Sequence, residues 1–276
     1  MDQIGILHHP RIPESEPLSK KIGDWLENNG HDFWAASTWE EDLVQASINQ
    51  SKLLIVLGGD GSLLRAARMA VQADVPIFGI NMGRVGFLSE AQLNDWPTRL
   101  TRVLGGDYWI EERLLIRAEL LRNHKVVDQF TALNDLVIGR GQQARVVRFQ
   151  LWVDGDMVTT YTADALIVST PTGSTAYAMA AGGPLLPPQL QNFVVLPVAP
   201  HLTFNRSLVL HEEAEIVIDL DMDHEAYLTP DGQHGVSLQS GDKILIRKND
   251  KRCKFARVES SGYFYRRLMG RLGYTR

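Results

Sequence analysis

The strongest constraint on the fold of this chain is a change in its hydrophobic pattern near residue 100. Before that point, apolar runs at residues 4–7, 53–57 and 76–80 have the continuous character of strands buried on both faces. Helical segments separate them, one between Ser15 and Gly30 and another over residues 62–71. Alternating strands and helices favour a parallel sheet with crossover helices, so residues 1–100 are predicted to form an α/β domain.

After that point the pattern changes to short strands separated by turns. Asp154-Gly155 and Asp231-Gly232 have the chemistry of hairpin turns, and one helix near Ser174 interrupts the series. These features predict a β-rich domain over residues 101–255. Its strands are expected at residues 114–121, 146–153, 166–169, 193–198, 214–220 and 243–247.

The C-terminal segment combines a helical pattern with positive charge. The helix is expected at residues 263–272 and is predicted to return to the first domain, which residues 256–276 then complete. From Arg247 to Arg276 there are ten Lys or Arg against two acids, although the whole chain has a net charge of −5. Basic segments can bind nucleic acid, but this one lacks the interleaved aromatic residues of RNA-binding segments. A nucleic-acid partner is therefore not expected.

Composition limits the class of protein further. With 276 residues, 44% of them apolar and 22% charged, the chain is typical of a globular protein with one or two cores. No apolar run approaches the roughly 20 residues that span a bilayer, and no basic leader precedes an apolar stretch at the N-terminus. The single cysteine, Cys253, rules out an intrachain disulfide and a cysteine-based zinc site. We therefore expect a cytoplasmic protein that has no membrane partner.

A glycine-rich loop, Gly-Gly-Asp-Gly-Ser at 58–62, stands between a predicted strand and a predicted helix. Glycines let the backbone approach a phosphate group, and the start of the helix supplies N–H groups and a favourable dipole. Asp60 is unexpected there, because a carboxylate repels phosphate. It fits if it orients an attacking hydroxyl and accepts the proton of that hydroxyl. The alternative is a plain strand-to-helix turn with Asp60 as the cap of the helix.

A second loop, Thr-Pro-Thr-Gly-Ser-Thr-Ala-Tyr at 170–177, follows the apolar strand at 165–169. Five of its eight residues carry hydroxyls and the others are small or proline, so the loop has little to pack. We expect it to expose backbone N–H groups and hydroxyls to a polar ligand such as a nucleotide.

Polar residues also lie beside two other predicted strands. Asn-Met-Gly-Arg-Val-Gly-Phe-Leu at 81–88 has two glycines three residues apart, and Phe87 either packs on the flat ring of a ligand or belongs to the core. Asn134 and Asp135 precede an apolar strand. Their amide and carboxylate suit the two hydroxyls of a ribose, although such a pair is also common where a turn meets a strand.

Three isolated residues are weaker candidates. Asp164 either anchors the 170–177 loop or simply starts a strand, and Arg145 either meets a phosphate or is simply exposed. Gln233 follows a hairpin turn and is either a ligand contact or only solvated. The eight histidines have no metal-ligand spacing, and no Ser-His-Asp signature is present.

Together, these motifs resemble the bacterial type of NAD kinase, in that family's order and over nearly the whole chain. The motifs shared with that family are Gly-Gly-Asp-Gly at 58–61, Asn-x-Gly-x-x-Gly-Phe-Leu at 81–88, Leu-Asn-Asp at 133–135, Thr-Pro-Thr-Gly-Ser-Thr-Ala-Tyr at 170–177, Ala-Gly-Gly-Pro at 181–184, Pro-His-Leu at 200–202 and Asp-Gly-Gln at 231–233. The glycine loop alone is shared with lipid kinases and phosphofructokinases, whereas the block at 170–184 is far more specific.

The resemblance implies transfer of the ATP γ-phosphoryl group to the 2′-hydroxyl of the adenosine ribose of NAD, which yields NADP. Asp60 would be the general base, and a divalent ion, normally Mg²⁺, would neutralise the ATP phosphates. The protein would form a homodimer or homotetramer. The loop around the ATP phosphates would consist of Gly58, Gly59, Gly61 and Ser62. The residues implied to contact NAD are Asp60, Gly61, Arg65, Phe87, Asn134, Asp135, Arg145, Thr162, Asp164, Thr175, Ala176, Tyr177, Ala178, Met179, Ala180 and Gln233.

The chain departs from the family pattern at three positions. Ser62 stands where Thr is common, which is a mild change. Asp135 stands where Glu is frequent, so its reach toward a ribose is one methylene shorter. Thr162 stands where the family often has a basic residue, and this removes a charge that usually contacts the phosphates of the substrate.

Two other functions compete with this prediction. A kinase for lipids or sugar phosphates shares the glycine loop, but it leaves the 170–177 loop and the pair Asn134-Asp135 unexplained. A non-catalytic module that only senses dinucleotides would have no need of Asp60. NAD kinase activity therefore accounts for the largest number of motifs.

Overall fold

The structure is a computed structural model that describes residues 3–83, 86–141, 145–201 and 204–271. Its internal contacts divide the chain into two compact units. Unit 1 consists of Met1–Glu112 with Cys253–Arg276, and unit 2 of Arg113–Arg252. The sequence predicts the first boundary near residue 100, but the structure has it later. The strand β6 (Trp109–Arg113), which follows that point, still belongs to the sheet of unit 1.

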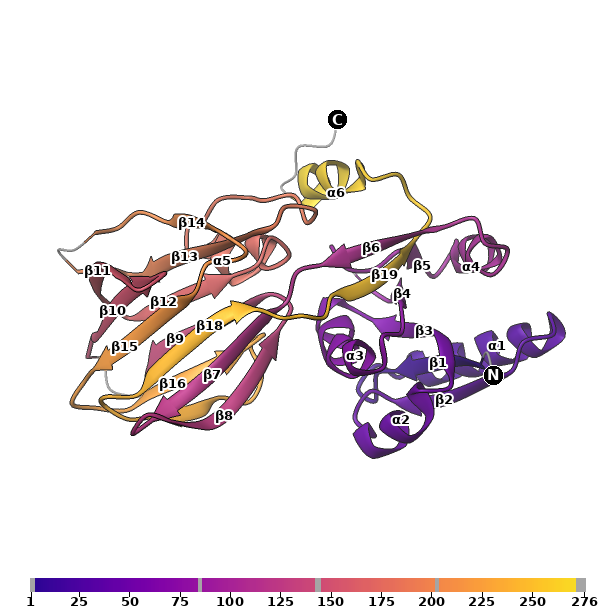
Figure 1. Cartoon of the computed structure of the whole chain (residues 1–276). Coiled ribbons are helices and arrows are strands. Elements are labelled where there is room, and N and C mark those ends of the chain that lie inside the picture. Colours follow the sequence, from indigo (N-terminus) through magenta and orange to yellow (C-terminus); the bar gives the residue numbers. More distant parts are fainter. Residues whose placement is uncertain (1–2, 84–85, 142–144, 202–203, 272–276) are drawn as a thin grey trace. The chain divides into compact units, whose positions relative to one another are not determined.

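Unit 1 is built around a sheet that is parallel over most of its width (Figure 1). Among the described residues its strand order is β2-β1-β3-β4-β19-β6, and β5 also pairs with β4. The pairs of β1 with β2 and β3, and of β4 with β3, β5 and β19, are parallel. The strands besides β6 are β1 (Gln3–His8), β2 (Phe33–Ser37), β3 (Ser51–Gly58), β4 (Ile77–Asn81), β5 (Ala91–Gln92) and β19 (Cys253–Arg257). The helices of unit 1 are α1 (Ser15–Asn28), α2 (Glu41–Ile48), α3 (Asp60–Ala73), α4 (Trp96–Leu104) and α6 (Tyr263–Arg271).

Different helices cover the two faces of this sheet. Ile80 of β4 shares a core with Ile22 of α1 and Leu100 of α4. Side chains alternate along a strand, so Gly79 faces the other side of the sheet. There Leu63 of α3 lies so close that a Cβ at Gly79 would come within 2.7 Å of it. The missing side chain lets α3 pack against the sheet, and this positions the glycine loop at the start of α3.

The C-terminal segment completes unit 1. β19 pairs in parallel with β4 through Phe255 and Ile77, although these residues are far apart in the sequence (Figure 1). Helix α6 follows and packs Phe264 and Leu268 against Phe87. The predicted fold class, a parallel α/β part completed by a returning C-terminal helix together with a β-rich part, is confirmed.

Unit 2 consists of two antiparallel sheets that share one core. Among the described residues, the first has the order β11-β10-β15-β18-β7-β8 and the second β14-β13-β12-β9-β16-β17. Buried residues of both sheets, such as Phe149 of the first and Leu166 of the second, belong to the same hydrophobic cluster. The strands are β7 (Ile116–Arg122), β8 (Lys125–Ala132), β9 (Asp135–Arg140), β10 (Val147–Val153), β11 (Asp156–Ala163), β12 (Ala165–Ser169), β13 (Asn192–Val198), β14 (Leu208–His211), β15 (Ile216–Asp221), β16 (Ala226–Pro230), β17 (Val236–Leu238) and β18 (Lys243–Lys248).

Several elements differ from the sequence prediction. Strands such as β8 are not predicted, because β8 lies at the edge of its sheet and residues 125–129 are exposed, so no buried face produces an alternating pattern. The helix expected near Ser174 consists only of a 3₁₀ turn, Gly173–Thr175, and the single-turn helix α5 (Tyr177–Ala180). Glycine and the β-branched threonines of this stretch are poor helix formers.

Some predicted features lie outside the described residues. These are Arg84 and Val85 of the 81–88 motif, Leu202 of the Pro-His-Leu motif, and residues 272–276 of the basic segment. Among the residues that the structure describes, none of the helices is both long and apolar enough to cross a membrane.

The core that the two sheets of unit 2 share is expected to supply much of the stability of this unit. Phe149 is fully buried in that core, so replacement by Ala is expected to lower the free energy of unfolding by about 3–5 kcal/mol. The matched control is Arg148→Ala on the same strand, where the side chain is 64% exposed and its ion pair with Asp221 spans 3.7 Å. That change is expected to cost less than about 1 kcal/mol. Urea unfolding of both variants measures the difference, and equal losses would contradict the shared core.

Candidate active site

Asp60 is the first residue of α3, which starts two residues after the end of β3. It does not cap its own helix. Its carboxylate oxygens instead accept hydrogen bonds from the backbone N–H groups of Phe87 and Leu88, at 3.0 and 3.1 Å. A Cβ at Gly86 would lie 2.0 Å from Asp60 Oδ1, so only glycine allows this approach. Asp60 therefore holds the 86–88 turn against the start of α3, and its side chain remains 31% exposed.

The predicted phosphate loop has an open backbone around Asp60. Gly58 has a φ of +147°, and a Cβ there would meet the Ser62 hydroxyl at 2.2 Å, so this position needs glycine. At Gly59 and Gly61 an added Cβ would meet no atom of the described residues within 4 Å. Among the residues that the structure describes, nothing packs on this side of the loop, at the start of a helix where backbone N–H groups can bind an anion.

Phe87 and Arg65 have other partners in unit 1. The Phe87 ring is 6% exposed and lies in a small core with Phe264, while the guanidinium of Arg271 lies 4.8 Å above it. This burial agrees with the alternative that Phe87 is a core residue, and its contact with NAD stays a prediction. Arg65 forms an ion pair of 3.1 Å with Glu41. The guanidinium of Arg271 also lies 3.8 Å from Asp60, a neighbour that the sequence motifs do not indicate.

In unit 2, Asp231 organises the predicted ribose-binding residues. Its carboxylate accepts hydrogen bonds from three consecutive backbone N–H groups, those of Leu133, Asn134 and Asp135, at 3.0, 2.7 and 3.3 Å. In return the Asp231 N–H donates to the Asp135 carbonyl at 2.9 Å. The Asp231-Gly232 turn therefore not only joins two strands but also supplies the carboxylate that fixes the backbone of residues 133–135. A hairpin motif alone does not indicate this long-range role.

The pair of carboxylates has an electrostatic consequence. Asp135 is 4% exposed, and burial, followed by the neighbouring charge of Asp231, raises the pKa of Asp135 to about 7. The Asp135 carboxyl therefore titrates near neutral pH rather than in the acid range.

The 170–177 loop differs from the prediction that it exposes its donors and hydroxyls. Residues 170–174 are buried, and their hydroxyls bond within the protein. Thr170 donates to the Leu133 carbonyl at 2.6 Å, and Ser174 donates to the carbonyl of Pro171 at 2.7 Å. The Thr172 hydroxyl accepts from Arg113 at 3.0 Å. The expectation of an open loop is therefore wrong for this first half, because small hydroxyl side chains can satisfy buried backbone groups as well as a ligand.

Gly173 brings this buried half of the loop to the 133–135 segment. A Cβ there would lie 2.1 Å from the backbone oxygen of Asn134. The same oxygen accepts a hydrogen bond from the Thr170 N–H at 2.9 Å. The Thr-Gly-Ser sequence and the Asn-Asp pair, which the sequence treats as separate motifs, are thus one packed unit.

The second half of the loop borders a cavity of about 360 Å³ in unit 2. Tyr177, which is 43% exposed, and Asp164 both line it. Asp164 forms an ion pair of 3.3 Å with Arg140, another lining residue. The structure thus brings together two predicted residues and adds Arg140 and Tyr227, which no motif indicates. The remaining lining residues are Val137, Gly139, Ala165, Val198 and Thr229.

Other predicted residues do not line this cavity. Arg145 is exposed and pairs with Asp223 at 3.3 Å, and Thr162 lies on β11, where its carbonyl accepts from the His201 N–H at 2.8 Å. Gln233 lies just after the Asp-Gly turn and donates its N–H to the Pro230 carbonyl. Of the neighbours of Tyr177, Ala178 is buried, whereas Met179 and Ala180 are exposed and Thr175 and Ala176 are half-buried.

Unit 1 holds a larger cavity of about 700 Å³, and it contains none of the predicted site residues. Its lining residues are Ser89, Glu90, Ala91, Gln92, Arg99, Glu259, Arg266, Arg267, Gly270 and Arg271. In the part of the chain that the structure describes, no group of three or more His, Cys, Asp or Glu side chains is arranged to hold a metal ion.

A parallel sheet with a glycine-rich strand-to-helix loop, joined to a two-sheet β unit, is an architecture that this chain shares with solved kinases of nicotinamide dinucleotides. An NAD kinase from Archaeoglobus fulgidus, solved in complex with ATP, has a TM-score of 0.78 and 26% identity, with full coverage of both chains. Yeast NADH kinase, solved with NADH, shares the fold with a TM-score of 0.84 at 22% identity, over all of this chain and 88% of that one.

Sequence comparison identifies the family within this class. The model of the ATP-NAD kinase N-terminal domain matches residues 18–108, and that of the ATP-NAD kinase C-terminal domain matches residues 133–258. An NAD kinase of Dehalococcoides mccartyi is 38% identical over 267 residues, which are 96% of this chain and 94% of that protein. An NAD kinase of Chloroflexus aurantiacus is 36% identical over 99% of both chains. The chain belongs to the ATP-NAD kinase family.

The close approach at Gly173 predicts a sharp effect of one methyl group. Gly173→Ala is expected to lower the free energy of unfolding by about 1–3 kcal/mol, because the backbone of Asn134 has to move. The control is Gly262→Ala, where the nearest atom to an added Cβ is a flexible arginine end at 4.0 Å. Thermal or urea unfolding compares the two variants. A neutral result at Gly173 would show that the two segments do not pack as described.

The raised pKa of Asp135 predicts a pH dependence of stability. The unfolded chain loses this proton near pH 4 and the folded chain near pH 7, so the stability that the protonated carboxyl contributes is present below pH 4 and is lost as the pH rises to about 7. Asn at position 135 does not titrate. The free energy of unfolding of the wild type is therefore expected to fall by about 2–3 kcal/mol more than that of Asp135→Asn between pH 5 and pH 8.

Urea unfolding at the two pH values measures this loss. The exposed Asp128 on β8 offers a control. Asp128→Asn is expected to have nearly the same free energy of unfolding as the wild type at both pH values. If the free energies of unfolding of Asp135→Asn and the wild type differed by the same amount at pH 5 and at pH 8, Asp135 would not titrate as described.

Proposed function

We propose that the protein transfers the γ-phosphoryl group of ATP to the 2′-hydroxyl of the adenosine ribose of NAD, with Asp60 as the general base. Membership of the ATP-NAD kinase family makes it an enzyme that phosphorylates NAD to NADP with ATP. The observation that carries the finer assignment is Asp60, a partly exposed carboxylate in a glycine loop whose backbone is open at Gly59 and Gly61.

The geometry of Asp60 supports the role of a base. Each carboxylate oxygen accepts one backbone N–H, from Phe87 or Leu88, and keeps a further lone pair. These two bonds orient the carboxylate so that a free lone pair can accept the proton of the 2′-hydroxyl. The bond between O2′ and the γ-phosphorus forms while the bond from that phosphorus to the bridging oxygen breaks. ADP leaves with the electron pair, and Asp60 takes the proton.

The glycine loop is the proposed contact for the ATP phosphates. Gly58, Gly59, Gly61 and Ser62 stand at the start of α3, where backbone N–H groups and the helix dipole favour an anion. Mg²⁺ is proposed to arrive with ATP as part of that substrate and to neutralise its phosphates. Because the transition state of phosphoryl transfer is loose, most of the rate enhancement comes from positioning and charge stabilisation.

Residues of unit 2 are the proposed contacts for NAD. Asn134 and Asp135, held by Asp231, offer an amide and a carboxyl group to ribose hydroxyls. The cavity lined by Tyr177 and Asp164 offers an aromatic ring and a charge beside an open sheet face. The other residues named from the sequence stay proposed contacts, as do the homodimeric or homotetrameric state and the cytoplasmic location.

Replacing the proposed base tests the assignment. Asp60→Asn is expected to lower turnover by about two to four orders of magnitude while the affinity for NAD changes little, because the proton acceptor is lost while the other residues proposed to contact NAD remain. The measurement combines purified protein with ATP, Mg²⁺ and NAD, and reads NADP with an NADP-specific dehydrogenase. Calorimetry measures the affinity for NAD.

The control is the same substitution at the other end of the same helix. Asp74 follows the last residue of α3, its side chain is 67% exposed, and its left-handed backbone is one that Asn adopts readily. Asp74→Asn is expected to keep wild-type turnover. Normal turnover of Asp60→Asn would overturn the base assignment, and binding of NAD by the wild type without any NADP would favour a non-catalytic module.

A further inference from the structure

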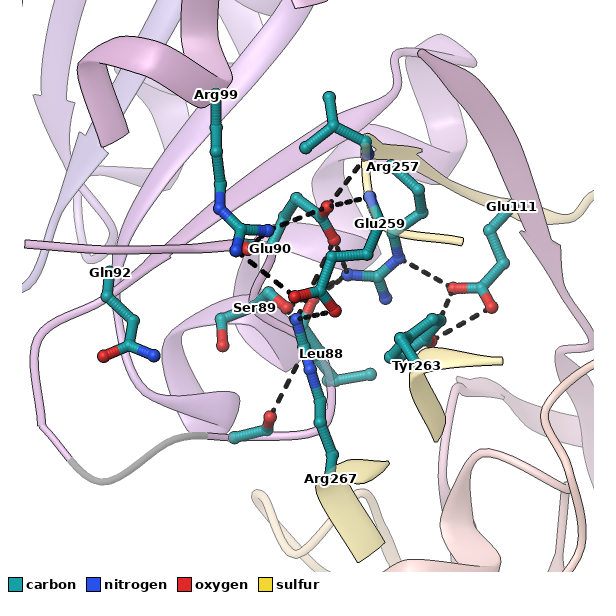
Figure 2. Close-up of polar contacts among 12 residues, drawn as sticks. Leu88, Ser89, Glu90, Gln92, Arg99, Glu111, Arg257, Glu259, Tyr263 and Arg267 are labelled. Atoms are coloured by element: carbon teal, nitrogen blue, oxygen red, sulfur yellow. Dashed lines mark hydrogen bonds and ion pairs between the residues drawn. The ribbon is translucent and has the colours of Figure 1, made fainter. Parts of the chain in front are cut away.

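Arg257, at the end of β19, is a charged side chain with no exposure to solvent. Its Nε donates to Glu111 at 2.8 Å, and its Nη1 donates to the carbonyls of Leu88 and Ser89 at 2.9 and 3.1 Å and to Glu90 at 3.3 Å (Figure 2). Glu90 and Glu111 are themselves buried, so this cation is held between two carboxylates. Two of its four bonds, however, go to main-chain oxygens of a turn rather than to acids.

Arg267, on α6, is directed at the same turn. Its side chain is 11% exposed and its Nη1 donates to the carbonyls of Gly86, at 3.4 Å, and of Ser89. Its Nη2 pairs with Glu259 at 3.2 Å (Figure 2). The two arginines thus supply donors to carbonyl groups at three positions of residues 86–89.

One of these carbonyls, that of Gly86, belongs to a peptide unit whose N–H Asp60 accepts, and that of Leu88 belongs to the next residue that donates to Asp60. The carbonyl of Gly86 and the N–H of Phe87 lie in one planar trans peptide, whose two ends point in opposite directions. Arg267 contacts the oxygen of that peptide, and Asp60 accepts its N–H at 3.0 Å. The next N–H, that of Leu88, also donates to Asp60, and the carbonyl of Leu88 accepts from Arg257. Arg267 and Asp60 are therefore connected through one rigid peptide, and Arg257 and Asp60 through the backbone of a single residue, Leu88.

We propose that Arg257 and Arg267 are positioning residues for the phosphoryl transfer, because they fix the 86–89 turn whose N–H groups orient the carboxylate of Asp60. The inference rests on the proposed role of Asp60 as general base. Neither arginine contacts a reacting atom in this proposal. Their effect on the reaction passes through the main chain of the turn, and it is lost when the carboxylate that the turn orients is lost.

Arg99 provides a matched control in the same network. It pairs with Glu90 and Glu259, as Arg267 does, at 3.4 and 3.2 Å. Its bond to the main chain goes to the carbonyl of Glu90, which lies beyond the 86–89 turn (Figure 2). Replacing Arg99 therefore disturbs the same acids but leaves the turn that contacts Asp60 in place.

The test compares Arg267→Lys with Arg99→Lys, each in the wild type and in the Asp60→Asn background. Lysine keeps the charge near Glu259 but loses the planar fork that bonds two groups at once. Arg267→Lys is expected to lower kcat about tenfold or more while the Kd for NAD changes less than about twofold, since small displacements of a catalytic group are costly. In the Asp60→Asn background the same change is expected to alter the residual turnover less than about twofold.

A structural readout accompanies the kinetics. Hydrogen exchange of peptides that cover residues 86–89 is expected to accelerate in Arg267→Lys and to stay at the wild-type rate in Arg99→Lys. Arg257→Lys serves as a second variant with the same expected pattern. If its full burial prevents folding, Arg267→Lys still tests the inference.

The outcomes separate the inference from the function on which it rests. Equal losses of turnover from Arg267→Lys in both backgrounds would overturn the inference alone, because the arginine would then act independently of Asp60. Equal losses from Arg267→Lys and Arg99→Lys would also overturn it, since a general loss of stability would explain both. Normal turnover of Asp60→Asn by itself would overturn the base assignment, and the inference with it.

Discussion

The buried charge of Arg257 is the constraint on which the arrangement of unit 1 depends. A guanidinium removed from water is tolerated only when acids and carbonyls replace its hydration. Glu111 and Glu90 supply the acids, and both come from segments more than a hundred residues earlier in the chain. Satisfying one buried cation therefore fixes the position of β19 and the 86–90 segment together. Removing one partner of such a group typically costs about 3–5 kcal/mol, because the other charge stays buried.

In both units, a carboxylate accepts hydrogen bonds from consecutive backbone N–H groups of a turn. Asp60 accepts from Phe87 and Leu88, and Asp231 accepts from residues 133, 134 and 135. In each case the acid lies far in the sequence from the turn that it organises. Charge-assisted bonds of this kind are about twice as strong as neutral ones, so each turn is held rigidly without a regular helix or strand. Both turns carry residues that the proposed reaction uses, and this rigidity suits a reaction that depends on positioning.

The 170–177 loop differs from what its sequence predicts. Its hydroxyl-rich sequence favours an open, ligand-facing loop, yet Thr170 and Ser174 use their hydroxyls to satisfy buried carbonyls. Hydroxyl side chains serve either purpose, and sequence alone does not reveal which oxygen lies nearby. Phe87 is a similar case, because its burial against Phe264 depends on a helix near the other end of the chain. Motif spacing predicts that these segments contribute to the site, but it does not indicate how their atoms are used.

Local patterns in the sequence determined the elements and their order. Apolar runs define strands such as β3 and β12, Asp154-Gly155 closes a hairpin, and the alternation of strands and helices sets unit 1 apart from unit 2. These features depend on neighbouring residues alone, so they are readable along the chain. Only the tertiary structure decided that β19 pairs with β4, that Arg257 meets Glu111, and that Asp60 faces the 86–88 turn. Such contacts join residues distant in sequence, and their free energy depends on burial and on partners that no local pattern contains.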